Sequence, residues 1–371
     1  MSNQNAASIE GFEVQKTASI QPLERTRELV LAYGWNTTSY QILNPGIKRW
    51  FAPGEDAVVG FASATGVRVV AGAPVCEIEK LSEVVREFET DAQKSKETVC
   101  YFAAESRLEA VYKNLQTHAR FLLGAQPVWE PKNWAEIVKT HKSLRAQVNR
   151  ARNKDVKVTE WTKEKAYKNP LLEKCLKDWL DAKGLPPLHF LVEPDTLTRL
   201  YDRRVFVATR GEEVVGFVLL SPVATRNGWL FEQFVHSPNA PNGTVELMID
   251  TAMRALAADG ADYATLGLSP LSVRAPIESF DNPLWLRILL AWLRKHAQRF
   301  YNFDGLDAFK AKLQPSAWEP VFAIYNRPRI SPRMIYAVAS VFSGNRPVRM
   351  VLGGLWRAVL TEIRWLKERF S

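Results

Sequence analysis

The sequence predicts an α+β fold made of two similar halves. Its 371 residues, 46% of them hydrophobic, suffice for two domains with separate cores. Runs of β-forming residues bounded by Gly and Pro alternate with helical periodicities, and this order occurs twice. We therefore expect a flexible tail (1–20), an α+β domain (21–130), a basic linker helix (131–154), a second α+β domain (155–326) and a cationic helical tail (327–371).

The first half reads as a short helix, a meander of strands and then alternating helices and strands. Residues 24–33 have helical character, and residues 39–75 alternate β-formers with Gly/Pro turns. The later elements follow in order: helix 80–96, strand 98–104, helix 105–115 and strand 119–129.

Residues 131–154 are predicted to form the helix that joins the halves. Ile137, Leu144 and Val148 recur at helical spacing on one side. Basic residues occupy other positions, namely Lys142, Arg145, Arg150 and Arg152.

The second half repeats the pattern of the first. We expect strand 157–161, helices 165–182 and 195–202, strands 204–210, 212–223 and 228–235, helix 243–259 and strand 262–269. Helix 243–259 has the clearest signal, because apolar residues recur every three or four positions from Val245 to Leu256. Asn242 is its expected N-cap, and Glu246 suits the positive end of the helix dipole.

Positive charge is concentrated in two segments. The net charge is +9, and residues 131–170 hold 11 Lys/Arg against 4 Asp/Glu, while residues 327–371 hold 9 against 2. Such clusters are found on solvated faces and on surfaces that bind nucleic acid, phosphate-bearing substrates or anionic membranes. The charge thus favours an anionic partner without naming it.

Cysteine and histidine are few and scattered. The three cysteines, Cys76, Cys100 and Cys175, are far apart, and the five histidines show no metal-ligand spacing, so we expect no disulfide, no metal site and no cofactor. The polar start resembles no signal peptide, and no window is long and apolar enough for a spanning helix. The expected location is cytoplasmic, with peripheral contact to the inner membrane open.

Four sequence blocks resemble one family, the C-terminal synthase domain of phosphatidylglycerol lysyltransferases. The blocks are VVAGAPV (69–75), SPNAPNG (237–243), ATLGLSPLS (264–272) and RFYNFDGLDAFKAKLQPSAWEPVFAIY (299–325), and the resemblance covers about residues 25–326. It implies tandem acetyltransferase-like (GNAT) domains, an active site mainly in the second domain, and transfer of an amino acid from aminoacyl-tRNA to a lipid. It also implies that residues 143–154 belong to the linker helix.

One block departs from the family pattern. Family members usually read Asp-Leu-Met-Arg before the Pro-rich loop, whereas this chain reads Glu232, Gln233, Phe234 and Val235. The acid is kept, but the arginine has become Val235. The activity class is therefore expected to be shared, while the donor or the acceptor can differ.

Candidate catalytic residues lie on the strand before this loop. By strand alternation Glu232 and His236 share one face, where they could act as base and proton shuttle or simply form an exposed strand surface. The loop and the following helix start supply candidate substrate contacts and oxyanion donors, either as an anion cradle or as an ordinary strand-to-helix turn. These residues are Asn239, Asn242, Gly243 and Thr244.

The last two family blocks add further candidates for substrate binding. They are Ser269, Arg274, Lys310 and Lys312. The two lysines could contact a phosphate or a tRNA 3′ end, or face solvent. The linker residues Lys142, Arg145, Arg150 and Arg152 are the candidates for donor binding.

Two apolar helices are predicted outside these motifs. Residues 282–300 suit buried packing or, alternatively, a lipid-chain entrance. From residue 348 an apolar stripe faces a basic side with Trp anchors, as in helices that lie in a membrane interface; docking on the second domain is the alternative. The candidate membrane residues are Arg349, Trp356, Arg357, Arg364 and Trp365.

Three functions remain in competition from sequence. The first is an aminoacyltransferase that moves an aminoacyl group from aminoacyl-tRNA to an anionic phospholipid such as phosphatidylglycerol. The second is a GNAT-type N-acyltransferase with an acyl thioester donor, for which coenzyme A is disfavoured because the loop SPNAPNG has two prolines and one glycine. The third is an inactive membrane-associated binding module. The identity of the carried group, the acceptor and the oligomeric state are left open.

Overall fold

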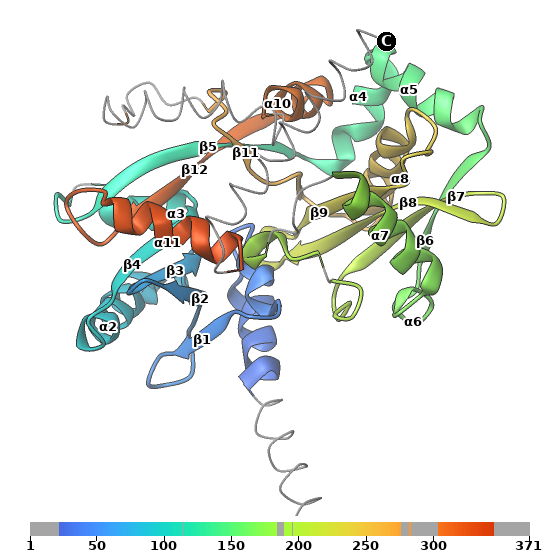
Figure 1. Cartoon of the computed structure of the whole chain (residues 1–371). Helices are drawn as coiled ribbons and strands as arrows, with labels where there is room; N and C mark the ends of the chain where they lie inside the picture. Colours follow the sequence, from blue (N-terminus) through green and yellow to red (C-terminus); the bar gives the residue numbers. More distant parts are fainter. Residues whose placement is uncertain are drawn as a thin grey trace, which may run out of the picture.

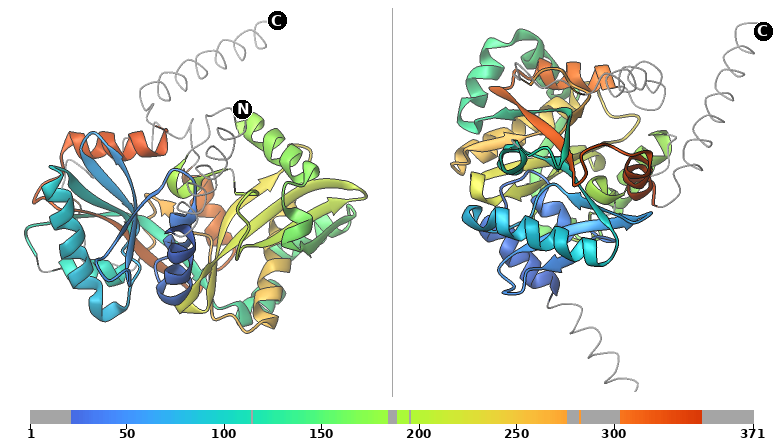
Figure 2. Two further views of the ribbon diagram at one scale, coloured as in Figure 1. Left: turned by 90° about the horizontal axis from the view of Figure 1, so that it is seen from below. Right: turned by 90° about the vertical axis from the view of Figure 1, so that its left-hand side faces the viewer.

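The described strands of both halves build one continuous sheet (Figure 1). The computed structural model describes residues 22–113, 115–183, 189–194, 196–275, 282 and 303–344. Helices cover both faces of the sheet, as the two turned views show (Figure 2). The predicted mixed α and β composition is confirmed.

The elements of the first half follow the predicted order. A helix over 22–33 precedes the short helix η1 (Ser39–Leu43). The remaining elements are β1 (Lys48–Phe51), β2 (Val58–Ala64), β3 (Val67–Ala71), α2 (Leu81–Lys94), β4 (Thr98–Ala104), α3 (Ser106–Tyr112) and β5 (Ala119–Trp129). Strands β1 to β3 are antiparallel, and β4 returns parallel to β3 after α2.

The second half repeats this arrangement. Its elements are α4 (Trp134–Thr140), α5 (Lys142–Arg152), β6 (Val156–Trp161), α6 (Lys163–Ala166), α7 (Pro170–Lys183), η4 (Phe190–Val192), β7 (Arg204–Arg210), β8 (Glu213–Val223), β9 (Gly228–His236), α8 (Thr244–Ala258), β10 (Tyr263–Thr265), β11 (Ser269–Pro270), α10 (Phe303–Lys312), β12 (Ala317–Tyr325) and α11 (Pro332–Phe342). Strands β6 to β9 are antiparallel, and β10 lies parallel to β9 after α8. Each half thus has an antiparallel meander followed by a helix and a parallel strand, which is the GNAT-like order of elements that we expected.

The two halves exchange their last strands. Strand β12, from the end of the second half, lies between β4 and β5, and β5, from the first half, pairs with β10. Each half therefore completes the sheet of the other. The division into separate domains at residues 130 and 155 stays a prediction, since the hydrogen-bonded sheet crosses it.

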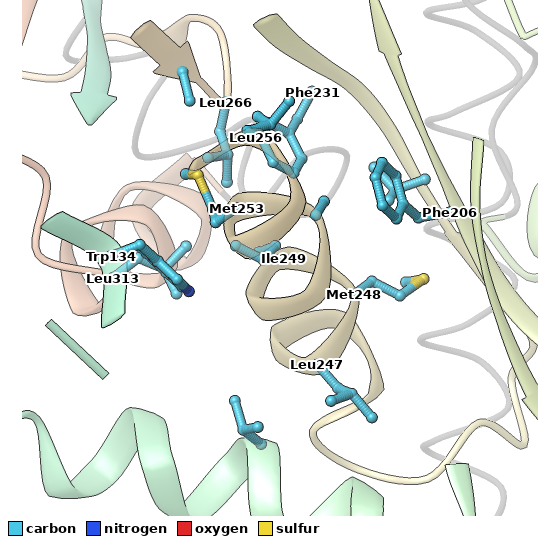
Figure 3. Packing of buried hydrophobic residues seen from close by; sticks show 14 of the residues in the cluster. Trp134, Phe206, Phe231, Leu247, Met248, Ile249, Met253, Leu256, Leu266 and Leu313 are labelled. Carbon is cyan, nitrogen blue, oxygen red and sulfur yellow. The ribbon is translucent and has the colours of Figure 1, made fainter. Parts of the chain in front are cut away.

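Alternation along the strands distributes side chains between cores on opposite faces. In β8, Val218 and Leu220 pack with α8, whereas Phe217 and Leu219 pack with α7. Helix α8 is buried on several sides, with Phe206 of the sheet on one side and Trp134 and Leu313 on another (Figure 3). This packing fixes α8, and with it the loop that precedes it.

A buried polar network joins the halves. Glu105 accepts hydrogen bonds from the backbone N of Thr37 (2.6 Å) and from Arg226 (3.3 Å). Arg226 also pairs with Glu319 at 2.9 Å, and its guanidinium lies 3.8 Å from the ring centroid of Tyr263. Since Glu105 follows β4, Arg226 precedes β9 and Glu319 lies on β12, the network ties three distant parts of the chain together.

Several local predictions were wrong. The predicted helix 165–182 is divided into α6 and α7, and the predicted strand 262–269 into β10 and β11. Residues 131–154 do not form one helix, because the extended backbone at His141 (φ −90°, ψ 95°) separates α4 from α5. Residues 196–202 form turns held by i to i+3 bonds, such as Arg199 N to Thr196 O, instead of a helix. The N-cap of α8 is Gly243 instead of Asn242.

Within the described residues, no helix is long and apolar enough to cross a bilayer. The predicted tail 1–20, most of the predicted helix 282–300, and the candidate membrane residues Arg349, Trp356, Arg357, Arg364 and Trp365 lie outside the described residues.

Candidate active site

The candidate site lies where two neighbouring strands part. Strands β9 and β10 pair over three residues only, Gly228 to Leu230 with Tyr263 to Thr265. Beyond this point β9 stays with β8, while β11 pairs with β5. The second half of β9 and the segment after β10 therefore diverge, and the predicted residues Glu232 and Ser269 lie on these two segments.

Glu232 occupies a β-bulge on β9. The register between β8 and β9 shifts so that Leu219 faces Gln233 and Leu220 faces Phe231, which leaves Glu232 as the extra residue. Its side chain is 6% exposed and pairs with Arg203, with 2.8 Å between Oε1 and Nε. The bulge thus aims a carboxylate out of the regular ladder at the start of the divergence.

Arg203 is held by both halves of the chain. Its side chain is fully buried, donates to Asn44 Oδ1 (2.9 Å) and to the carbonyl of Arg199 (2.7 Å), and lies 4.9 Å over the ring of Tyr40. A planar guanidinium fixed by so many partners orients the paired carboxylate. Arg203 was not predicted from sequence, because its partner Glu232 is 29 residues away.

Val235, the residue that departs from the family pattern, does not face the carboxylate of Glu232. Val235 is fully buried and packs in the apolar core below α7. In this chain the arginine that pairs with Glu232 is Arg203.

His236 lies apart from Glu232, so the predicted shared face is wrong. A Cβ placed on Gly216 would lie 3.4 Å from both His236 Cβ and Met248 Cε, which puts His236 on the α8 side of the sheet. Glu232 points to the opposite side, toward Arg203. The bulge reverses the alternation on which the prediction depended. His236 Nδ1 lies 3.2 Å from the Ser237 carbonyl.

The Pro-rich loop is packed against α5. Gly243 has φ +95°, and a Cβ there would lie 2.1 Å from the carbonyl oxygen of Gln147. Thr244 N donates to Pro241 O at 3.1 Å, so this amide is already engaged within the loop and is not free for the expected oxyanion role. Asn239 and Asn242 are exposed on the loop.

The other predicted substrate residues do come together, around α10. Lys310 is buried and donates to the carbonyls of Gly267 (2.8 Å) and Leu268 (3.0 Å), next to Ser269. Arg274 donates to Asp307 Oδ2 at 2.6 Å, and Lys312 pairs with Glu246 on α8 at 3.4 Å. Helix α10 therefore connects the segment after β10 with the first turn of α8.

This cluster contains polar atoms that are buried and unpaired. Ser269 is 1% exposed and Asp307 is 8% exposed, yet Ser269 Oγ and Asp307 Oδ1 have no hydrogen-bond partner within the described chain. Buried polar atoms are rarely left unpaired unless a ligand or water completes them. Burial lowers the pKa of Lys310 to about 7, against the opposing effect of Asp307.

The linker residues divide into two kinds. Lys142, Arg145 and Arg150 are exposed on α5, and none of them forms an ion pair within the described residues. Arg152 instead pairs with the fully buried Asp250 at 2.8 Å, which also accepts from Trp134 (3.0 Å). Arg152 therefore holds α5 on α8, whereas the first three form an exposed cationic face.

The fold and this site define a class of protein. A GNAT-like α/β chain, with divergent strands flanked by a fixed acid and by buried polar groups, has the architecture of an acyltransferase. The chain belongs to the phosphatidylglycerol lysyltransferase C-terminal family, whose model matches residues 27–325. The predicted family and the predicted enzyme class are confirmed.

Curated relatives are longer proteins. The bifunctional lysylphosphatidylglycerol biosynthesis protein LysX of Mycolicibacterium gilvum is 23% identical over 306 residues, which are 79% of this chain and 26% of that protein. LysX of Mycobacterium ulcerans is 30% identical over 137 residues, 35% of this chain and 11% of that protein. The chain thus spans about a quarter of the length of the first of these relatives.

Solved structures share the fold. The C-terminal domain of a putative lysylphosphatidylglycerol synthetase from Agrobacterium fabrum matches with a TM-score of 0.74 at 19% identity, over 88% of this chain and 98% of that one. L-PGS from Bacillus licheniformis matches with a TM-score of 0.70 at 19% identity, over 90% and 95%. FemX matches with a TM-score of 0.52 at 10% identity, over 89% and 98%.

Proposed function

We propose that this chain transfers an aminoacyl group from aminoacyl-tRNA to a hydroxyl of an anionic phospholipid such as phosphatidylglycerol. The observation that carries the proposal is the carboxylate of Glu232, held by Arg203 in a bulge at the point where β9 and β10 part. The family membership over residues 27–325 supplies the reaction class.

The reaction needs an acyl donor, a deprotonated acceptor and a path for one proton. The lipid hydroxyl oxygen attacks the ester carbonyl carbon of the aminoacyl-tRNA, and the bond from that carbon to the ribose oxygen breaks. The proton leaves the lipid hydroxyl and ends on the ribose oxygen, with Glu232 as its carrier. Arg203 is a positioning residue, since it fixes the orientation of this carboxylate.

The cluster at α10 would bind the aminoacyl end of the donor. Asp307 Oδ1 is a buried, unpaired acceptor and suits the α-ammonium group of an amino acid. Lys310 holds the backbone carbonyls of Gly267 and Leu268 and so shapes the segment after β10. The exposed cationic face of α5 would bind the phosphates of the tRNA.

The test is transfer of labelled aminoacyl groups to phosphatidylglycerol vesicles. We expect label in the lipid fraction that is lost when the tRNA is first digested with ribonuclease. Glu232→Gln should lower the transfer rate at least 100-fold, which is within the range for loss of a general base, while donor binding stays. The control variant Glu160→Gln removes an exposed carboxylate that pairs with Arg204 and should keep the rate.

Mass spectrometry of the lipid product separates the competing reactions. An aminoacylated phospholipid supports the proposal, whereas an N-acylated amine made from an acyl thioester contradicts it. Absence of any ribonuclease-sensitive lipid label with every amino acid would also contradict it.

A further inference from the structure

Helix α11 presents an exposed surface that the transfer reaction does not use. Its inner side packs on β2 and β3 through Met334, Ala337 and Val341. On its outer side Ile335 is 39% exposed and Tyr336 is 44% exposed. Figure 1 shows α11 lying across the outside of the first half. Two adjacent apolar side chains are thus presented to the surroundings.

The segment that leads into α11 and the first turn of α11 carry an excess of positive charge. Arg327, Arg329 and Arg333 are exposed, and none of them pairs with a carboxylate among the described residues. Residues 326–344 contain no Asp or Glu. The acids at the neighbouring end of the sheet, Asp91 and Glu97, are already bound to Arg68 at 2.6 Å each. Helix α11 and the segment before it are therefore cationic and also expose two apolar side chains.

This surface is linked to the strand segment that carries Glu232. The carbonyl of Phe342 at the end of α11 accepts from His189 N at 3.0 Å, just before η4. In the same loop the carbonyl of Glu193 accepts from the side chain of Gln233, the neighbour of Glu232. Two hydrogen bonds thus connect α11, through the segment 189–193, to the bulge that holds the carboxylate of Glu232.

We propose that α11 and the segment that leads into it dock on an anionic phospholipid bilayer through the exposed residues Arg327, Arg329, Arg333, Ile335 and Tyr336. Arginines attract the negative lipid headgroups, and the two apolar side chains enter the interface. Such a docked chain would receive its lipid acceptor from the α11 side, while the tRNA binds at α5. The role of this docking rests on the proposed function, but the experiment below measures membrane binding alone.

The experiment is sedimentation of the whole chain with vesicles, without tRNA. We expect binding to vesicles of phosphatidylglycerol and phosphatidylcholine, and little binding to phosphatidylcholine alone. Arg327→Gln with Arg329→Gln should weaken binding about 25-fold, from about fivefold per arginine near an anionic surface. Ile335→Ser with Tyr336→Ser should weaken it at least fivefold.

A matched control distinguishes binding through this surface from nonspecific binding by exposed apolar side chains. Tyr167 and Leu171 are 50% and 45% exposed near α6 and α7, and Tyr167→Ser with Leu171→Ser should leave vesicle binding unchanged. Thermal unfolding of every variant shows that the fold is kept. Equal binding by the α11 variants and the unchanged chain, or no preference for phosphatidylglycerol, overturns the proposal. A chain that binds vesicles through α11 but transfers no label would contradict only the proposed function.

Discussion

The buried carboxylate of Glu105 makes stability depend on pH in an unusual direction. Glu105 is 3% exposed, and burial raises its pKa to about 7 from an ordinary value of 4.5, against the opposing effects of Arg226 and Thr37. The folded state therefore binds this proton more tightly than the unfolded state does. Its contribution to stability is fully present below pH 4.5 and is lost as the pH rises through about 7.

The size of the effect follows from the two pKa values. Each tenfold difference in proton affinity is worth about 1.4 kcal/mol, so the contribution of Glu105 changes by about 3 kcal/mol between pH 4.5 and pH 8. Glu105→Gln imitates the protonated acid at every pH. The variant and the unchanged chain should therefore have similar free energies of unfolding near pH 4.5, and the variant should be about 3 kcal/mol more stable at pH 8.

The measurement is urea unfolding at several pH values, followed by tryptophan fluorescence. Only the difference between the variant and the unchanged chain is used, because other titrating groups are common to both. Glu83→Gln, an exposed change on α2 with the same loss of charge, gives the baseline. If Glu105→Gln becomes relatively less stable as the pH rises, the ion pair with Arg226 outweighs the burial and the reasoning is refuted.

Three further predictions concern packing and charge. Gly243→Ala should lower the free energy of unfolding by about 3 kcal/mol, because an alanine there is strained and its Cβ clashes with the carbonyl of Gln147. Gly211→Ala, at φ +59° but with open space around it, should lower the free energy of unfolding by only about 1 kcal/mol. Denaturant unfolding measures both, and equal losses would contradict the close contact between Gly243 and Gln147. Arg145→Gln should weaken tRNA binding and reduce its salt dependence by about one ion without a change in Tm. Arg152→Gln should lower Tm by a few degrees, because the buried Asp250 loses one of its two arginine partners and keeps only Arg254 and Trp134; the reverse pattern would contradict their assigned roles. Removal of residues 317–371, which include β12, should abolish the single cooperative transition of the chain, and a retained single transition would show that the two halves fold together without β12.

Local patterns predicted most of the elements. Helix α8 was predicted within two residues at each end, because its apolar repeat is strong and α8 is packed as that repeat requires. Local sequence patterns were less reliable where contacts between distant residues determine the backbone conformation. The turns over 196–202 place Arg199, Asp202 and Arg203 against partners in the first half, and no local pattern reveals those partners.

The candidate site could be predicted only in part. Ser269, Arg274, Lys310 and Lys312 were named from sequence and lie in one neighbourhood. The side on which Glu232 lies could not be predicted, since a one-residue bulge reverses the alternation of a strand and has no signature in FEQFVH. Asp307 lies within a recognised block, and its spacing of three residues before Lys310 was the signal that the sequence offered.

The exchange of β5 and β12 also sets the order in which the chain can fold during synthesis. Strand β4 is complete by residue 104, but the neighbour that separates it from β5 is made more than 200 residues later. During translation β4 therefore either keeps an unpaired edge, or pairs with β5 until β12 is made and replaces β5 beside it. Exposed edges of this kind favour association with other chains. We therefore expect efficient folding to depend on how long the growing chain remains in this incomplete state, which pulse-chase protease protection of ribosome-bound chains can measure.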